Sequence, residues 1–251
     1  METHANHLHH APGKKIWHYF YEFLMLFLAV FCGFLAENFR EHRVEAEKAE
    51  QYIISLYEDL KSDTVKLSKA MQYDEQKVLA LNNMFSCYDT IQKNWRATSC
   101  MLELVRKSQT NRVFQLTDRT LRQLANAGGY RLLRKEDADS IISYESVFKA
   151  FEDFQSTAFQ EAQDNVRNLF SMIVDFKANA QIHGTFIGAE TTEENINTPM
   201  LFSPDKVLLN RYFNELLLYL RVTKGHRAQM ERIQIKATGL IAFYKNKYHL
   251  E

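Results

Sequence analysis

The longest apolar run of the chain lies near its N-terminus, at residues 16–36, and reads IWHYFYEFLMLFLAVFCGFLA. These 21 residues contain one formal charge, on Glu22. At a rise of about 1.5 Å per residue, a helix of this length spans roughly 31 Å, the thickness of a bilayer's hydrocarbon core. Trp17, Tyr19 and Tyr21 cluster at its first end, where aromatic rings favour the headgroup region. The pattern predicts a transmembrane helix over residues 16–36.

Two other structures share this length and apolarity: a cleaved signal peptide and the buried core helix of a water-soluble protein. The run is longer than the apolar region of a signal peptide, and no small-x-small cleavage site follows it. Phe31 before Cys32 is also unsuited to a lipoprotein-type site. A membrane anchor is the preferred interpretation, and the buried helix is the alternative.

Beyond residue 37, apolar side chains recur at spacings of three and four, the period of one helix face. The transmembrane helix is predicted to continue without a break into the first such stripe, which consists of Ala46, Ala49, Ile53, Leu56, Leu60, Leu67 and Ala70. Later stripes predict further helices up to about residue 93, at 100–107, at 117–128, at 136–176 and from 203 onward, with a turn at 94–99.

The sequence therefore predicts an all-α fold in which one N-terminal transmembrane helix continues into an elongated antiparallel helical bundle. Residues 1–15 form a short His-containing tail. Residues 37–251 form the helical domain, with one long loop at about 181–203.

Capping residues predict several helix ends. Thr117 is expected to begin one helix, and the Gly128-Gly129 pair is expected to end it in the left-handed conformation. Ser203 is expected to cap the last helix, with Pro204 in its first turn. Gly225 is a candidate break that would divide this last helix in two.

Composition and charge exclude several function classes. Apolar residues make up 46% of the chain, whereas 8 Gly and 3 Pro are too few for a turn-rich sandwich or barrel. The 31 Lys and Arg are balanced by 31 Asp and Glu, which removes the electrostatic driving force for binding nucleic acid. The sequence has no Walker loop, GxGxxG, HExxH, GxSxG or carboxylate-x-x-His motif. We predict no nucleic-acid partner, no catalytic residue, no cofactor and no enzymatic activity.

Two groups of residues leave metal or redox chemistry open. The first is a set of four histidines in the tail, His4, His7, His9 and His10. Neutral imidazole is a good ligand for transition metals, but a plain tail is the preferred interpretation, so no metal site is predicted. The second is Cys87 with Cys100, which would form a disulfide in an oxidising compartment. Two separate buried thiols are the preferred interpretation.

One face of the predicted transmembrane helix is polar at one end and small at the other. It consists of His18, Glu22, Leu26, Ala29, Gly33 and Ala36, at spacings of four, four, three, four and three, and we call it the transmembrane seam. Ala29 and Gly33 would permit close helix approach, and Glu22 with His18 would face protein or water. We predict a homo-oligomer, most simply a dimer, continued by the stripe from Ala46 to Leu60. The alternative is a lone helix whose His18 and Glu22 reach the headgroups.

The order of intramembrane Glu22, spaced small residues and the exit Glu37-Asn38-Phe39 resembles a family of uncharacterised bacterial single-pass membrane proteins, in which this exit typically reads Asn-Asn-Trp. The segment TLRQLANAGGYRLLRKEDADSIISYE, residues 120–145, is similar to the family's helix, glycine turn and second helix. The resemblance covers about residues 14–151. It implies an inner-membrane protein with its helical domain outside the cytoplasm, and it implies no activity.

The flanking charges do not assign the orientation by themselves. Lys14 and Lys15 precede the apolar run, whereas Arg40, Arg43 and Lys48 follow it among four glutamates. With the resemblance, we predict a bacterial inner-membrane protein with a periplasmic domain. Its expected partners are the lipid bilayer, other copies of itself, and a membrane or periplasmic protein. The predicted function is a membrane-anchored scaffold or sensor; the alternative is an auxiliary transport or channel subunit that uses Glu22 and His18.

Overall fold

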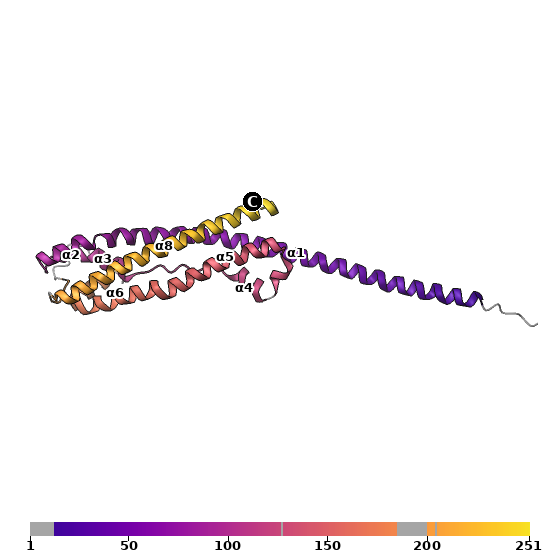
Figure 1. Cartoon of the computed structure of the whole chain (residues 1–251), viewed down its shortest axis with the longest axis horizontal. Coiled ribbons are helices and arrows are strands. Elements are labelled where there is room, and N and C mark those ends of the chain that lie inside the picture. Colours follow the sequence, from indigo (N-terminus) through magenta and orange to yellow (C-terminus); the bar gives the residue numbers. More distant parts are fainter. Residues whose placement is uncertain (1–12, 127, 185–199, 204) are drawn as a thin grey trace, which may run out of the picture.

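The chain folds into a long, narrow bundle of helices from which a single helical arm extends (Figure 1). The computed structural model describes residues 13–126, 128–184, 200–203 and 205–251. Within these residues the secondary structure is helical, apart from one isolated antiparallel bridge between Val174 and Leu201. The predicted all-α fold class is confirmed.

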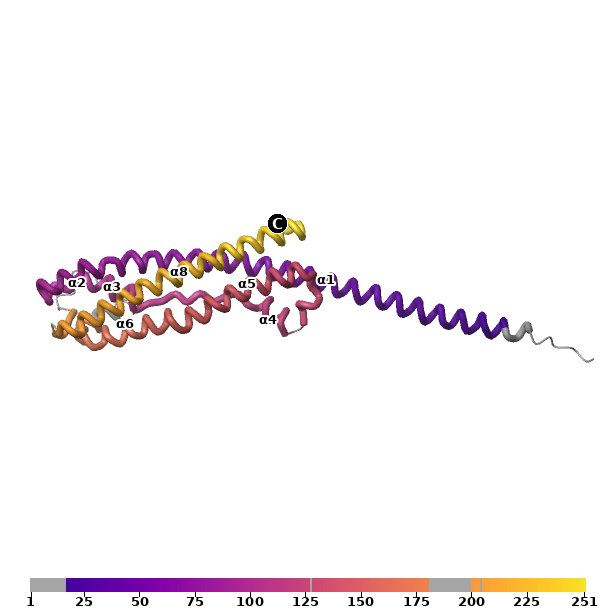
Figure 2. Tube along the Cα trace, viewed as in Figure 1, coloured from indigo at the N-terminus to yellow at the C-terminus, as the bar shows by residue number. Residues whose placement is uncertain are grey.

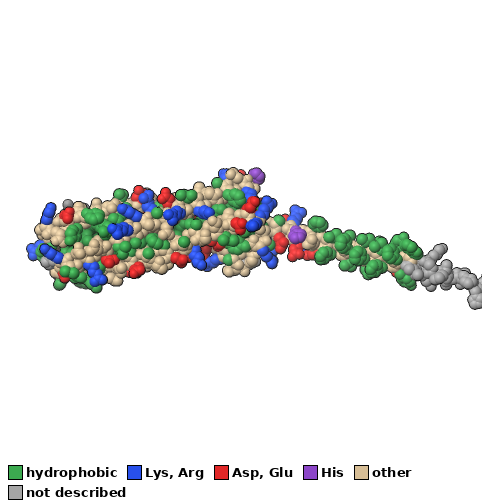
Figure 3. All heavy atoms as spheres, in the orientation of Figure 1, with side chains coloured by type: hydrophobic (Ala, Val, Ile, Leu, Met, Phe, Trp, Pro, Cys, Tyr) green, Lys and Arg blue, Asp and Glu red, His purple; other side chains and the backbone are tan. Residues whose placement is uncertain are grey.

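Helix α1, Gly13–Asn82, forms the arm and then continues without a break into the bundle, as predicted (Figure 2). Residues 17–48 have no buried side chain, and burial begins to rise at Ala49. One window of this arm is long and apolar enough to cross a membrane, and none of it is buried. Apolar side chains cover most of the outer part of the arm, whereas charged side chains gather where the arm joins the bundle and are interspersed over the bundle (Figure 3).

The remaining elements form the bundle. They are α2 Met84–Lys93, α3 Met101–Gln109, α4 Arg119–Asn126, a 3-10 turn Gly129–Leu132, α5 Lys135–Phe154, a π turn Gln155–Phe159, α6 Gln160–Ile173, α7 Phe176–Gly184 and α8 Lys206–Tyr248. The predicted turn at residues 94–99 separates α2 from α3. Gly128 has a φ of 63° between α4 and the 3-10 turn, the left-handed conformation expected there.

Three rods make up the bundle: α1, the continuous α5–α6 pair and α8. Helix α8 is antiparallel to α1, because Tyr57 hydrogen bonds to Glu251 while Asp74 contacts His226. The α5–α6 rod runs parallel to α1. This direction is possible because residues 110–118 return the chain to the end near the arm, with Thr110 beside Lys77 and Thr117 beside Asp63.

Two apolar clusters fill the core. The cluster near the arm includes Ile53, Leu56, Leu60, Phe151, Ile233 and Tyr244. The far cluster includes Leu81, Leu104, Phe159, Val166, Tyr212 and Leu216. All three rods contribute to both clusters, so the amphipathic stripes of α1 and α8 are buried as their spacing predicts.

Several predicted helix ends are wrong in detail. Thr117 does not cap α4, because its hydroxyl and backbone N–H both donate to the Asp63 carboxylate, 2.6 Å and 3.0–3.1 Å away. Asp205, not Ser203, caps α8 by accepting from the N–H groups of Val207 and Leu208. A carboxylate at this position also interacts favourably with the positive end of the helix dipole. Pro204 lies outside the described residues.

The long predicted helix ends before Phe176, which is 82% exposed at the start of α7. The predicted loop at 181–203 is wrong at its start, because residues 181–184 belong to α7, whereas Met200 and Leu201, near its end, lie outside the helices and are buried. Residues 185–199 lie outside the described part of the chain. Gly225 does not divide α8. Instead, it lies where α8 passes Phe154, whose ring would be 3.4 Å from a Cβ at this position.

Candidate functional site

The transmembrane seam lies on an arm that contacts no other part of the described chain. All six of its side chains are exposed, and no heavy atom lies within 4 Å of the place where Gly33 would carry a Cβ. His18 and Glu22 come together, with Nε2 and Oε1 3.4 Å apart. The seam is thus a continuous helix face with room for a partner, and its role in assembly stays a prediction.

The predicted continuation of the seam beyond Ala46 is wrong. Ile53, Leu56 and Leu60 are at most 1% exposed and pack inside the chain's own bundle. Because α8 and the α4–α5 region cover this stripe, it is not available to a second copy. The helix between the apolar run and the bundle instead carries ion pairs one turn apart, Arg40 with Glu37 and Arg43 with Glu47. Such pairs stabilise an isolated helix in water.

A layer of buried polar side chains separates the two apolar clusters. We call it the polar layer; its members are the buried Asp74, Lys77, Gln155, Tyr219 and His226 and the half-buried Asn111. Asp74 and Lys77 come from α1, Tyr219 and His226 from α8, and Gln155 begins the π turn. π turns inside α-helices occur often at functional sites.

His226 is held on three sides. Its Nδ1 lies 2.6 Å from an Asp74 carboxylate oxygen, its Nε2 lies 3.1 Å from the Gln155 amide oxygen, and Phe159 stacks on the ring with centroids 4.0 Å apart. The backbone of Phe114 fixes the Gln155 amide, because its N–H donates to Oε1 and its carbonyl accepts from Nε2. Nε2 of His226 must therefore donate to Gln155, because the amide oxygen can only accept.

Lys77 is the second charged group of the polar layer, and its side chain is fully buried. Its Nζ donates to the Thr110 carbonyl and the Tyr219 hydroxyl, both at 2.7 Å, and to the Asn111 side chain. Although Asp74 favours the ammonium, burial dominates and lowers the pKa of Lys77 to about 7. Lys77 therefore changes charge near neutral pH.

We expect the bundle to become more stable as the pH rises from about 7 to 9. In this range the unfolded chain binds a proton at Lys77 that the folded chain has lost, so the free energy of unfolding rises by up to ~1.4 kcal/mol per pH unit. Above about pH 10 the trend reverses, because burial raises the pKa of Tyr219 and raises that of Tyr244 to about 12. Urea denaturation at several pH values measures this profile, and Lys77→Met should remove its rising part. Identical profiles for the two proteins would contradict the assignment.

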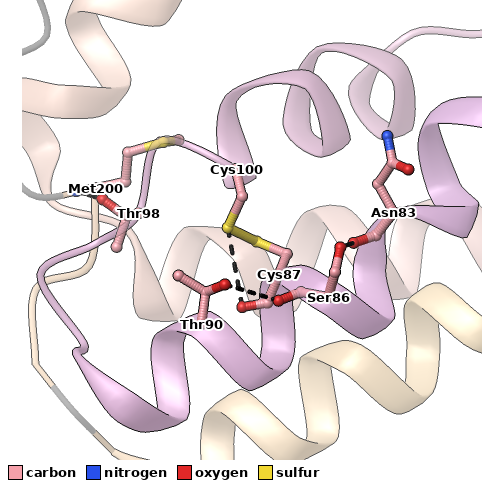
Figure 4. The surroundings of a disulfide bond; sticks show 7 residues. All are labelled: Asn83, Ser86, Cys87, Thr90, Thr98, Cys100 and Met200. Carbon is pink, nitrogen blue, oxygen red and sulfur yellow. Dashed lines mark hydrogen bonds between the residues drawn. A yellow bond between two sulfur atoms is a disulfide. The ribbon is translucent and has the colours of Figure 1, made fainter.

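Cys87 and Cys100 form a disulfide between α2 and the start of α3, with their Cα atoms 5.5 Å apart (Figure 4). The preferred interpretation of two separate thiols is wrong: the turn at 94–99 folds back so that the two cysteines face each other. The backbone N–H of Met200 donates to the Thr98 hydroxyl in this turn at 2.8 Å, which connects the turn to the chain before α8. Cys32 is an exposed thiol on the arm.

The structure offers little for metal chemistry. In the described part of the chain, no group of three or more His, Cys, Asp or Glu side chains is placed to hold a metal ion. The tail cluster of His4, His7, His9 and His10 lies outside that part.

The sequence analysis missed the polar layer, although a signal for it exists. Asp74 and Lys77 continue the core-facing spacing from Ala70 to Leu81, in steps of four, three and four. His226 likewise precedes Met230 by four residues on the core-facing side of α8. Polar residues at core positions of two helices indicate a buried polar contact, although they do not say which residues pair.

Comparison with known protein families, curated proteins and solved structures finds no match to the chain.

Proposed function

We propose that this chain is a membrane-anchored helical protein that works through interactions, as a scaffold or a sensor, and not as an enzyme. One observation carries the proposal: a single 70-residue helix contains both an unburied apolar window of membrane-spanning length and one wall of the bundle. Because no break separates the two parts, a rotation or shift of one end would move the other. Purification of the full chain from native membranes tests this, since an interaction protein should come with further copies or a stable partner.

The proposed location is the inner membrane of a bacterium, with the bundle in the periplasm. The Cys87–Cys100 disulfide supports an oxidising compartment for the bundle, because disulfides are rare in the cytosol. The resemblance of residues 14–151 to single-pass membrane proteins supports the same orientation.

Thiol labelling in cells tests this orientation. In a Cys32→Ser background, we expect the denatured chain to react with a maleimide only after reduction, because Cys87 and Cys100 are bonded outside the cytoplasm. A reporter that is active only in the cytoplasm, fused after Glu251, should be silent. Labelling without reduction, together with strong reporter activity, would reverse the orientation.

We propose further that the transmembrane seam joins two copies of the chain. Ala29 and Gly33 are small and exposed on one helix face, so two helices can approach closely there. In a Cys32→Ser background, single cysteines at Ala29 and Gly33 should give covalent dimers in membranes, while Leu28→Cys, on another face, should not. Equal crosslinking at all three positions, or an intact oligomer in Gly33→Leu, would contradict the seam.

The alternative function is an auxiliary subunit of a transport or channel assembly. The observation that favours it is the 3.4 Å contact between His18 and Glu22 in the apolar run, where a charged side chain costs about 2.5–3.5 kcal/mol. Such a path would require several copies of the chain, with His18 and Glu22 of each copy facing a water-filled central pore. Ion flux in proteoliposomes that Glu22→Gln abolishes would support this function over a pure scaffold.

A further inference from the structure

A groove with a volume of about 1140 Å³ lies beside the polar layer, toward the end of the bundle far from the arm. Its walls come from α1, from α2, from α3 and from the residues that precede and follow α3. Cys100 lines the groove, so the disulfide fixes one wall to α2. The volume is sufficient for a small molecule.

The charges along this groove do not cancel. Arg106, Lys107 and Arg112 line it together with a single acid, Glu103, which leaves a net charge of +2. Over the residues that the structure describes, none of the three cations forms an ion pair within 4.0 Å. This local excess contrasts with the whole chain, in which 31 basic and 31 acidic residues balance.

Two of these cations, Lys107 and Arg112, converge on one aromatic ring. Lys107 Nζ lies 5.8 Å, and Arg112 Cζ lies 5.4 Å, from the ring centroid of Tyr73, which also lines the groove. Lys77 Nζ lies 5.3 Å from the same centroid, and its hydrogen-bond acceptors Thr110 and Asn111 form part of the wall. Lys107 and Arg112 thus repel each other, and they repel Lys77 while it is protonated, so a bound anion would relieve that repulsion.

We propose that this groove, the cationic groove, binds a small oxyanion, that is, a molecule that carries carboxylate or phosphate groups. The guanidinium groups of Arg106 and Arg112 match the geometry of either group through paired hydrogen bonds, and Lys107 adds a point charge. The site goes beyond the proposed anchoring function and depends on neither topology nor oligomeric state. Because Tyr73 belongs to α1, a ligand here contacts the same helix that carries the apolar run.

Calorimetric titration of the full chain in detergent micelles tests the proposal, with citrate and inorganic phosphate as probes and potassium chloride at matched ionic strength as the reference. We expect saturable binding of one anion per chain that weakens as salt is added. Binding of citrate alone would assign a carboxylate ligand, and binding of phosphate alone a phosphoryl ligand, and both results support the site. No binding of either probe beyond the chloride reference would overturn it.

Variants locate the binding. Arg106→Gln with Arg112→Gln should weaken binding at least tenfold, and Lys107→Gln provides a second, single-site variant should the double variant fail to fold. Arg232→Gln is the matched control for Lys107→Gln, because it also removes one positive charge, from an exposed position on the half of α8 nearer the arm. Its affinity should stay within twofold of the parent protein. Equal affinities for the groove variants and the control would overturn the assignment of the site.

Discussion

Replacing His226 with Leu should lower the free energy of unfolding by about 3–5 kcal/mol, the largest effect that we expect from one substitution. Asp74 and His226 are at most 1% exposed and contact each other at 2.6 Å. The other carboxylate oxygen of Asp74 has no hydrogen-bond partner in the described chain. His226→Leu would therefore leave a buried carboxylate with no hydrogen-bond donor in contact with it, and breaking such a pair from one side is strongly destabilising. Urea denaturation of the full chain in detergent micelles at pH 7 measures the loss.

A double-mutant cycle separates this effect from a loss of packing around Phe159. Asp74→Leu with His226→Leu should be more stable than His226→Leu alone by more than about 1 kcal/mol, because the second change removes the unpaired charge. His42→Leu, at an exposed position on the arm, is the matched control and should change stability by less than about 0.5 kcal/mol. Additive losses from Asp74→Leu and His226→Leu would show that the two groups do not act as a pair.

The helices themselves were predictable from the sequence, because an amphipathic stripe is a local property. Spacings of three and four along α1 and α8 place Ile53, Leu60, Ile233 and Tyr244 in the core without any knowledge of their neighbours. The unbroken helix from the apolar run into the bundle followed from the same pattern, since no Pro or Gly interrupts it between residues 34 and 82.

The helix ends and the pairing of polar groups were not predictable in the same way. Thr117 has the chemistry of a cap, but the Asp63 carboxylate, 54 residues earlier, competes for its hydroxyl and backbone N–H. Likewise, Cys87 and Cys100 could be joined only once the turn between them was known. Such contacts depend on tertiary structure, which a local pattern does not encode.

The cationic groove shows the same limit. Arg106, Lys107 and Arg112 are ordinary surface residues in sequence, and only the fold brings them to Tyr73, which lies more than 30 residues earlier on α1. The transmembrane seam is the opposite case. Its residues lie on one helix face by spacing alone, so the sequence defines it fully, whereas a second helix packed against it stays a proposal.

Deletion of residues 1–36 should convert the protein from one that stays in membranes into a folded, water-soluble domain. The apolar window lies wholly in the deleted part, and both apolar clusters lie wholly in the part that remains, because packing begins only at Ala49. Removal of the 13 large exposed hydrophobic side chains between Trp17 and Leu35 eliminates the hydrophobic drive for insertion and takes no side chain from the core. We expect residues 37–251 to appear in the soluble fraction, with a denaturation midpoint close to that of the full chain. Deletion of residues 1–12, which keeps the apolar window, is the matched control and should remain in the membrane after an alkaline wash. A full-length chain that the same wash releases, or a shortened chain that cannot fold, would contradict the division of α1 into an anchor and a bundle wall.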